Sequence, residues 1–203
     1  MQLAGIEEIV VVVSPHKHGI SDYLGSGRRF GVDLTYVVQD EPLGLANAVL
    51  SGEHVIDGSF AVVLGDNFFH LKSFLGDLIS YHISQRADAT LGAAEVEDVT
   101  RHGIITVQGE RIKDIIEKPL PDKAPSTLGS IGIYVFETNL FDAIRRTKPG
   151  YKGEYQLTDS IKVLVDSGKK VIYKKIDGVH IDVGTPRDLV WANHWHFEYC
   201  GCD

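Results

Sequence analysis

The stretch VVQDEPLGLANAVLSG, residues 37–52, leads from an apolar strand into an apolar helix. The two valines end a β-branched run, and the spacing of apolar residues after position 44 predicts a short helix. Between these segments lie Gln39, two acids, a proline and Gly44. A simple connection between a strand and a helix needs no such set of residues, so we expect this loop to bind a ligand.

The same alternation of strand and helix continues along the chain. Apolar runs predict strands at residues 7–14, 33–39, 60–67, 87–97, 128–137, 170–176 and 180–183, and two short strands within 103–119 around a Gln108–Gly109 turn. Helical spacing covers residues 18–27, 44–52, 71–86, 139–147, 155–168 and 187–199. This order predicts one α/β domain with a mixed, mostly parallel sheet and antiparallel hairpin additions in the second half.

Composition excludes several classes of protein. The chain has 203 residues, 43% of them hydrophobic, which suits one domain with a substantial core. A net charge of -8 argues against nucleic-acid binding, and no apolar run is long enough to cross a membrane. The first residues lack the basic region of a signal peptide. Cys200 and Cys202 are too close together for an unstrained disulfide, so we expect reduced thiols and a cytoplasmic protein.

Polar residues at strand ends are the candidates for a site, because open α/β sheets bind ligands at the carboxyl ends of their strands. Asp66 follows the apolar run FAVVLG, and Asp182 follows HI and precedes Gly184. Each acid alone fits either a helix cap or a functional carboxylate. Two carboxylates on neighbouring strand ends are able to hold one Mg²⁺, which takes one or two carboxylates together with phosphate oxygens and water.

A cation and a glycine add to this set. Lys118 lies in the triplet EKP, where Pro119 favours an extended backbone, and it fits either a phosphate-binding or a solvated lysine. Gly132 interrupts the strand SIGIYVF, which indicates either a bulge or a close approach of another group to the backbone. The nine histidines are scattered, and no nucleophile elbow or paired cysteines are present.

Seven segments in order resemble the sugar-1-phosphate nucleotidyltransferases, in particular the glucose-1-phosphate thymidylyltransferases and their uridylyl relatives. The resemblance covers residues 3–193 and implies a Rossmann-like three-layer nucleotidyltransferase fold. Each motif is weak alone, and their order carries the assignment. The segments are LAGIEEIVVVVSP, VVQDEPLGLANAV, VVLGDNFF, GIITV with IIEKP, GSIGIYVF, GEYQLTDSI and IDVGTPRDLVWAN.

The resemblance implies a reaction and a role for each candidate. A nucleoside triphosphate, dTTP or UTP, would react with a sugar 1-phosphate, glucose 1-phosphate by expectation, to give a nucleotide sugar and pyrophosphate. Relatives are often multimers, so homo-oligomerisation is an open expectation. The implied roles are base recognition for Gln39, backbone approach to the nucleotide at Gly44, Mg²⁺ binding for Asp66 and Asp182, sugar contacts for Gly103, Glu117, Gly132 and Glu154, and phosphate binding for Lys118.

One family element is absent from the sequence. The family begins with a strand and a glycine-rich G-x-G-T-R turn that holds the triphosphate, and no such motif occurs in these 203 residues. We therefore expect an N-terminally truncated domain that lacks the first strand and has doubtful activity alone. A non-catalytic sugar-nucleotide-binding or regulatory subunit is the alternative. A glycosyltransferase is disfavoured because the sequence has no D-x-D triplet.

Overall fold

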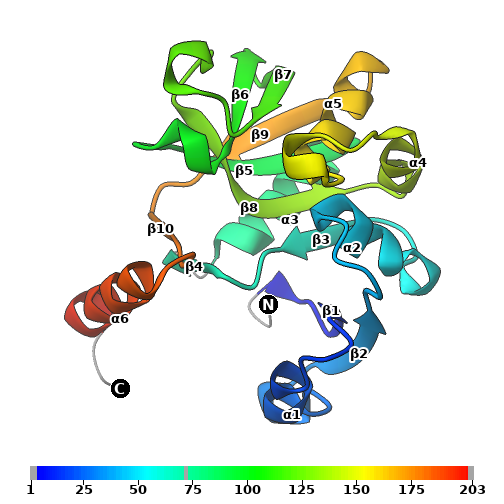
Figure 1. Ribbon diagram of the computed structural model, residues 1–203, viewed down its shortest axis with the longest axis vertical. Helices are drawn as coiled ribbons and strands as arrows, with labels where there is room; N and C mark the ends of the chain where they lie inside the picture. Colours follow the sequence, from blue (N-terminus) through cyan, green and yellow to red (C-terminus); the bar gives the residue numbers. More distant parts are fainter. Residues whose placement is uncertain (1–3, 71–72, 201–203) are drawn as a thin grey trace.

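The computed structural model describes residues 4–70 and 73–200, arranged around one central sheet (Figure 1). Cys202 and the side chain of Cys200 lie outside this description, as do residues 71 and 72 at the start of one expected helix. The expectation of two reduced thiols therefore stays a prediction.

Strands and helices form where the apolar periodicity predicted them. The strands are β1 Glu8–Val13, β2 Asp33–Val38, β3 Phe60–Val63, β4 Asn67–His70, β5 Ala89–Glu95, β6 Gly103–Gln108, β7 Arg111–Glu117, β8 Leu128–Phe136, β9 Val171–Lys175 and β10 Val179–Asp182. The helices are α1 Gly19–Leu24, α2 Leu45–Ser51, α3 Phe74–Gln85, α4 Asn139–Arg146, α5 Leu157–Asp166 and α6 Pro186–Cys200. Strand β4 was not predicted as a separate element.

The central sheet has six strands in the order β3-β8-β5-β9-β7-β6. The expectation of a mixed sheet is confirmed, but the expectation that it is mostly parallel is wrong. Of the described pairings in this sheet only β5 with β9 is parallel, and β8 runs antiparallel to both β3 and β5. The order of elements along the chain could not show this, because β8 enters the sheet between two strands that precede it in sequence.

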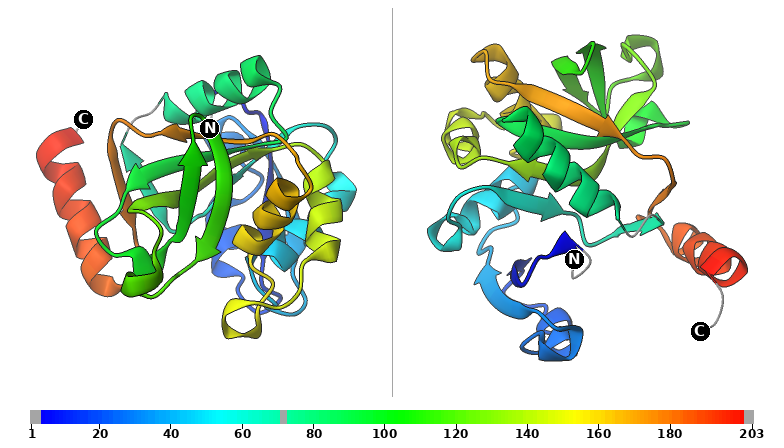
Figure 2. Two further views of the ribbon diagram at one scale, coloured as in Figure 1. Left: turned by 90° about the horizontal axis from the view of Figure 1, so that it is seen from above. Right: turned by 180° about the vertical axis from the view of Figure 1, so that it is seen from behind.

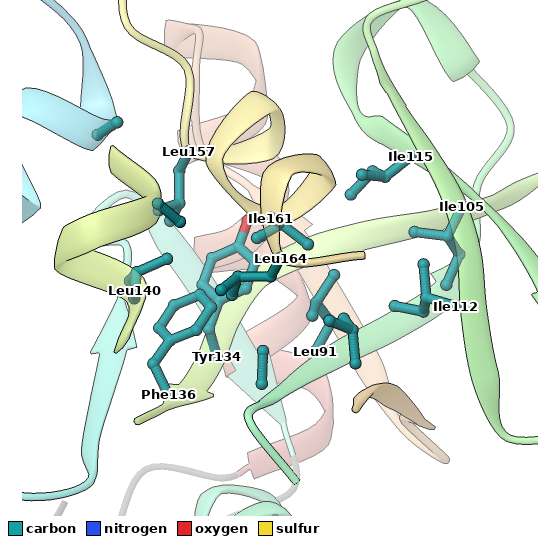
Figure 3. Packing of buried hydrophobic residues seen from close by; sticks show 14 of the residues in the cluster. Leu91, Ile105, Ile112, Ile115, Tyr134, Phe136, Leu140, Leu157, Ile161 and Leu164 are labelled. Atoms are coloured by element: carbon teal, nitrogen blue, oxygen red, sulfur yellow. The ribbon is translucent and has the colours of Figure 1, made fainter. Parts of the chain in front are cut away.

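Two apolar clusters cover the two faces of the sheet and give the fold three layers. All nine residues of β8 are buried, and their side chains alternate between the faces. Tyr134 and Phe136 pack against α4 and α5 through residues such as Leu140 and Ile161 (Figure 3). Ile133 and Val135 face the opposite way, toward α3, which covers the other face in the rear view of Figure 2.

Two short two-stranded sheets flank the central one. Strands β1 and β2 pair in parallel, and β10 pairs antiparallel with β4, which directly follows β3 in the chain. Among the described residues, β1 pairs only with β2, and β3 pairs only with β8. Strands β1 and β3 therefore each have one backbone edge without a strand partner among the described residues. Helix α6 follows β10 and lies at the periphery of the molecule (Figure 1).

Candidate active site

The loop that opens the sequence argument is fixed by its own hydrogen bonds. Gln39, which directly follows β2, donates from Nε2 to the Asn47 Oδ1 atom at 2.7 Å and to the Gly44 carbonyl at 3.2 Å. Both amide side chains are half-buried. The Gln39 side chain is thus hydrogen-bonded to the first turn of α2.

Gly44 joins this loop to a segment from the second half of the chain. Its φ is +113°, and a Cβ placed on it would lie 2.6 Å from the Tyr155 carbonyl oxygen and 3.0 Å from the Glu154 Cβ. Backbone bonds run from Tyr155 N to Leu43 O and from Ala46 N to Tyr155 O. The site therefore requires glycine here for both conformation and space, and Glu154 lies beside the loop.

Glu117 and Gly103 face each other on neighbouring strands. They are paired residues of β7 and β6, and Glu117 Oε2 accepts a 2.5 Å hydrogen bond from the Thr158 hydroxyl on α5. A Cβ on Gly103 would lie 3.1 Å from the Thr158 side chain and 3.4 Å from Glu117 Oε2. The absence of a side chain at Gly103 leaves room beside this carboxylate.

Lys118 does not take the extended backbone that Pro119 was expected to impose. Its φ is +43°, in the left-handed region, and its N–H donates to the His102 carbonyl at 3.0 Å. The strand pairing fixes this residue before the chain turns, and such a conformation in a residue other than glycine is costly and typical of functional sites. Its Nζ lies 3.7 Å from Glu117 Oε1 and 5.8 Å from the centre of the Tyr151 ring.

The two acids predicted to bind a metal lie at one strand junction. Asp182 pairs with Asn67 across β10 and β4, and Val183 N donates to the Asp66 carbonyl at 2.8 Å. Asp66 lies in the turn before β4, so the interpretation of Asp66 as a helix cap is wrong. Helix α6 is capped by Thr185 and Asp188, which exchange side chain–backbone hydrogen bonds in both directions.

Arg101 is a cation at this junction that the sequence did not reveal. Its Nη2 lies 2.8 Å from Asp182 Oδ2 and 3.2 Å from Asp188 Oδ2. The hydrogen bonds that Arg101 donates to these two carboxylates raise the pKa of its guanidinium. The only available signal was its position two residues before Gly103.

The chemistry of Asp66 and Asp182 fits Mg²⁺. Their backbones are adjacent, both are carboxylates at a solvent-reachable edge, and Gly184 leaves space beside Asp182. Within residues 4–70 and 73–200 no three His, Cys, Asp or Glu side chains are grouped to hold a metal. Two carboxylates completed by phosphate oxygens and water match the coordination that Mg²⁺ prefers.

Both explanations for a glycine inside β8 apply to Gly132: it lies in a bulge, and another group approaches its backbone closely. The register between β5 and β8 shifts near it, and its φ is +73°, so it belongs to a bulge. A Cβ on Gly132 would also lie 2.8 Å from the Asn67 Nδ2 atom. The Asn67 side chain therefore approaches the backbone where the strand lacks a side chain, beside the two acids.

Burial shifts the pKa values of two histidines and one carboxyl group around the site. Desolvation lowers the pKa of His102 and lowers the pKa of His180 to about 4. His180 Nε2 contacts Asn67 Oδ1, and the two imidazole rings lie 6.1 Å apart. Burial also raises the pKa of Asp159, with a further rise from the charge of Glu117. Both histidines are thus neutral near pH 7 and add no positive charge.

The predicted residues form neighbouring parts of one region rather than scattered positions. Gln39, Gly44 and Glu154 form the first part, Gly103, Glu117 and Lys118 the second, and Asp66, Asp182 and Gly132 the third. The first two connect through Gln156 Nε2, which donates to Glu154 Oε2 and to the Tyr151 carbonyl. The ring of the same Tyr151 lies 5.8 Å from Lys118 Nζ. The second and third connect through His102, whose carbonyl binds Lys118 N and whose ring lies near His180.

This arrangement agrees with the comparison to known proteins. The nucleotidyl transferase family model matches residues 1–196, and the chain belongs to that family. Two relatives come from Haloferax volcanii: the low-salt glycan biosynthesis nucleotidyltransferase Agl11, 38% identical over 96% of this chain, and the UTP–glucose-1-phosphate uridylyltransferase AglF, 37% identical over 91%. A glucose-1-phosphate thymidylyltransferase of Streptomyces antibioticus is 31% identical over 96%.

The chain spans 54% of Agl11, 75% of AglF and 54% of the Streptomyces enzyme. Among solved structures, a UDP-glucose pyrophosphorylase complexed with UDP-glucose matches with a TM-score of 0.88 at 28% identity, covering 97% of this chain and 83% of that one. A putative glucose-1-phosphate thymidylyltransferase from Bacillus anthracis matches with a TM-score of 0.85 at 30% identity, covering 96% and 78%. The predicted family and its α/β fold are confirmed. No helix in the described part of the chain has the length and apolarity to cross a membrane.

Proposed function

We propose that this protein joins a nucleoside triphosphate, UTP or dTTP, to a sugar 1-phosphate, with glucose 1-phosphate as the expected sugar. The observation that supports the proposal is that candidate residues from separate segments of the chain lie in neighbouring parts of one region. These parts contain Gln39 and Gly44, Glu117 and Lys118, and Asp182. The names of the relatives support the same substrates, since they act as glucose-1-phosphate uridylyl- and thymidylyltransferases. We place the reaction in the cytoplasm.

The proposed chemistry is an in-line displacement at phosphorus. An oxygen of the sugar 1-phosphate forms a bond to the α-phosphorus, the bond to the bridging β-phosphate oxygen breaks, and pyrophosphate leaves with its electron pair. A phosphate dianion is already a nucleophile at pH 7, so no protein base is needed. Positioning and charge compensation are then the main tasks of the protein.

Each part of the region has a task in this reaction. Lys118 holds the sugar phosphate as a point charge, while Glu117 and the space at Gly103 receive sugar hydroxyls. Gly132 and Glu154 border the sugar, and Gln39 with Gly44 holds the base and ribose. Asp66 and Asp182 would hold Mg²⁺, which when bound offsets the negative charge of the reacting phosphates.

A second candidate function is a sugar-nucleotide-binding subunit without turnover. It is favoured by the observation that these 203 residues contain no G-x-G-T-R sequence, the turn that in the family they resemble supplies hydrogen-bond donors and cations to the triphosphate. Loss of a single such donor costs about 10²–10³ in rate. We therefore expect slow turnover by this chain alone.

Pyrophosphate release tests the two candidates. The purified chain at high concentration is incubated with Mg²⁺, glucose 1-phosphate and UTP or dTTP, beside a Lys118→Ala variant and a Lys123→Ala control on an exposed turn. We expect slow release that needs both substrates and is lost only in Lys118→Ala. Binding of UDP-glucose without release would select the second candidate, and a folded chain with neither property would contradict both.

A further inference from the structure

We propose that Thr158, at the start of α5, is a positioning residue whose hydroxyl fixes the Glu117 carboxylate in the orientation in which it receives a sugar hydroxyl. The inference deepens the proposed function and rests on it, because the ligand is the sugar of that reaction. Thr158 acts only through Glu117. Its own segment, GEYQLTDSI, supplied Glu154 alone as a candidate site residue.

The Thr158 hydroxyl is committed to Glu117. It donates to Glu117 Oε2 at 2.5 Å, a length typical of a strong hydrogen bond to an ionised carboxylate. Thr158 is 8% exposed, and the Glu117 side chain is 13% exposed. Because water has little access to this pair, loss of the hydroxyl leaves Oε2 without a hydrogen-bond donor that could take its place.

The polar side chains at the start of α5 do not cap their own helix. Threonine in this position commonly bonds to a nearby backbone N–H, whereas Thr158 bonds to a carboxylate on β7. The N-cap residue Gln156 makes no side-chain cap either, and its Nε2 donates to Glu154 Oε2 at 3.3 Å. Two side chains at this helix start therefore hold carboxylates of the candidate site.

The Glu117 carboxylate is held from two sides, with space beside it. Thr158 binds Oε2, while Oε1 lies 3.7 Å from Lys118 Nζ. Gly103 is the residue paired with Glu117 across β6 and β7. A Cβ at Gly103 would lie 3.1 Å from the Thr158 side chain and 3.4 Å from Oε2, so any other residue there would crowd the pair. The space at Gly103 is where the proposed sugar hydroxyl reaches the carboxylate.

Fixing the carboxylate before the ligand arrives strengthens sugar binding. A glutamate side chain without the Thr158 bond would have to lose rotamer freedom on binding, and that loss would weaken the affinity. Among the described residues, the bond to Glu117 is the only hydrogen bond of the Thr158 side chain. Its removal should therefore weaken binding of the sugar and spare binding of the nucleotide part of the ligand.

Calorimetric titration with UDP and with UDP-glucose tests the inference. The dissociation constant for UDP divided by that for UDP-glucose, here called the sugar ratio, reports what the glucosyl group contributes. Thr158→Val keeps the shape of the side chain and removes the donor. We expect it to lower the sugar ratio about tenfold and to leave the affinity for UDP unchanged. Thr158→Ser keeps the hydroxyl and should retain the sugar ratio of the parent chain.

Thr147→Val is the matched control, because Thr147 is 7% exposed and its hydroxyl donates to the Ala143 carbonyl at 2.9 Å. This variant also loses a buried hydroxyl, but one that does not bind Glu117, and it should keep the sugar ratio. A second control uses Glu117→Ala. Adding Thr158→Val to that variant should lower the sugar ratio no further, because the group through which Thr158 acts is already absent.

Three results would overturn the role of Thr158: an unchanged sugar ratio in Thr158→Val, an equal fall in Thr147→Val, or a further fall when Thr158→Val is added to Glu117→Ala. Each of them leaves the proposed function intact if the parent chain binds UDP-glucose more tightly than UDP. A folded parent chain that binds neither ligand would contradict the proposed function and the inference together.

Discussion

At the scale of single residues, the site depends on positions where a side chain is absent as much as on those where one is present. Gly44, Gly103 and Gly132 each leave space that a Cβ would fill, and each space borders a polar side chain. The sequence indicated Gly44 by its loop and Gly132 by its place inside a strand, and the family resemblance indicated Gly103. It could not give the contacts of Arg101 or Asn47, because these depend on segments that meet only in the folded chain.

Replacement of Gly44 separates backbone strain from steric overlap. Gly44→Ala adds a Cβ 2.6 Å from the Tyr155 carbonyl at a φ of +113°, whereas Gly109→Ala adds one with no atom within 4 Å at a φ of +60°. We expect Gly109→Ala to cost about 1 kcal/mol of unfolding free energy and Gly44→Ala to cost clearly more. Urea denaturation of both variants checks this, and equal losses would count against the packing at Gly44.

Arg101 should compete with a metal ion at Asp182. Its Nη2 occupies Asp182 Oδ2, so Arg101→Gln removes a positive charge and frees that oxygen. We expect Mn²⁺, titrated without nucleotide and followed by electron paramagnetic resonance, to bind the variant about tenfold more tightly. The control is Arg187→Gln, an exposed residue of α6. Unchanged or weaker Mn²⁺ binding in Arg101→Gln would contradict this role.

Replacement of Asp159 by asparagine is predicted to increase the free energy of unfolding in a pH-dependent way. Burial and the charge of Glu117 raise the folded-state pKa of Asp159, so the folded protein binds its proton more tightly than the unfolded chain. The ionised carboxylate therefore destabilises the fold at pH 7, and this cost disappears as the pH falls through the carboxyl range. We expect Asp159→Asn to raise the unfolding free energy at pH 7 and to lose that gain near pH 3. Asp122→Asn, on an exposed turn, should show no gain at either pH.

At the scale of elements, periodicity located the helices and strands, but the neighbours within the sheet needed the structure. The apolar run of β8 and the helical spacing of α5 are local properties, visible in a short window of sequence. The insertion of β8 between β3 and β5 is a long-range property with no local signal. The left-handed Lys118 likewise contradicts the local rule for a residue before proline, because pairing with the His102 carbonyl overrides it.

Helix α3 offers a direct test of the second face of the core. Leu78 is fully buried against β8 and its neighbours, whereas Ile83 on the same helix is 63% exposed. We expect Leu78→Ala to cost about 2–5 kcal/mol of unfolding free energy and Ile83→Ala to change it by less than about 0.5 kcal/mol. Denaturation curves for the two variants measure both values. Similar losses would show that α3 does not cover the sheet as described.

At the scale of the whole molecule, the candidate site exists because distant segments converge beside one sheet. The loop after β2, the ends of β6 and β7, the α5 entry and the β4–β10 junction supply its parts (Figure 1). Each motif alone was ambiguous, and their order along the chain indicated the family that the comparison then confirmed. The roles of the individual residues remain predictions, because they depend on a bound ligand.

Titration of the chain with UDP-glucose and dTDP-glucose, followed by calorimetry, tests the central claim that this region is a sugar-nucleotide site. We predict saturable binding of at least one of them. Lys118→Ala should weaken it about tenfold or more, because a charge-assisted contact to phosphate is lost. Lys123→Ala should leave it unchanged. Absence of binding in the folded chain, or equal binding by the parent and Lys118→Ala, would contradict the account.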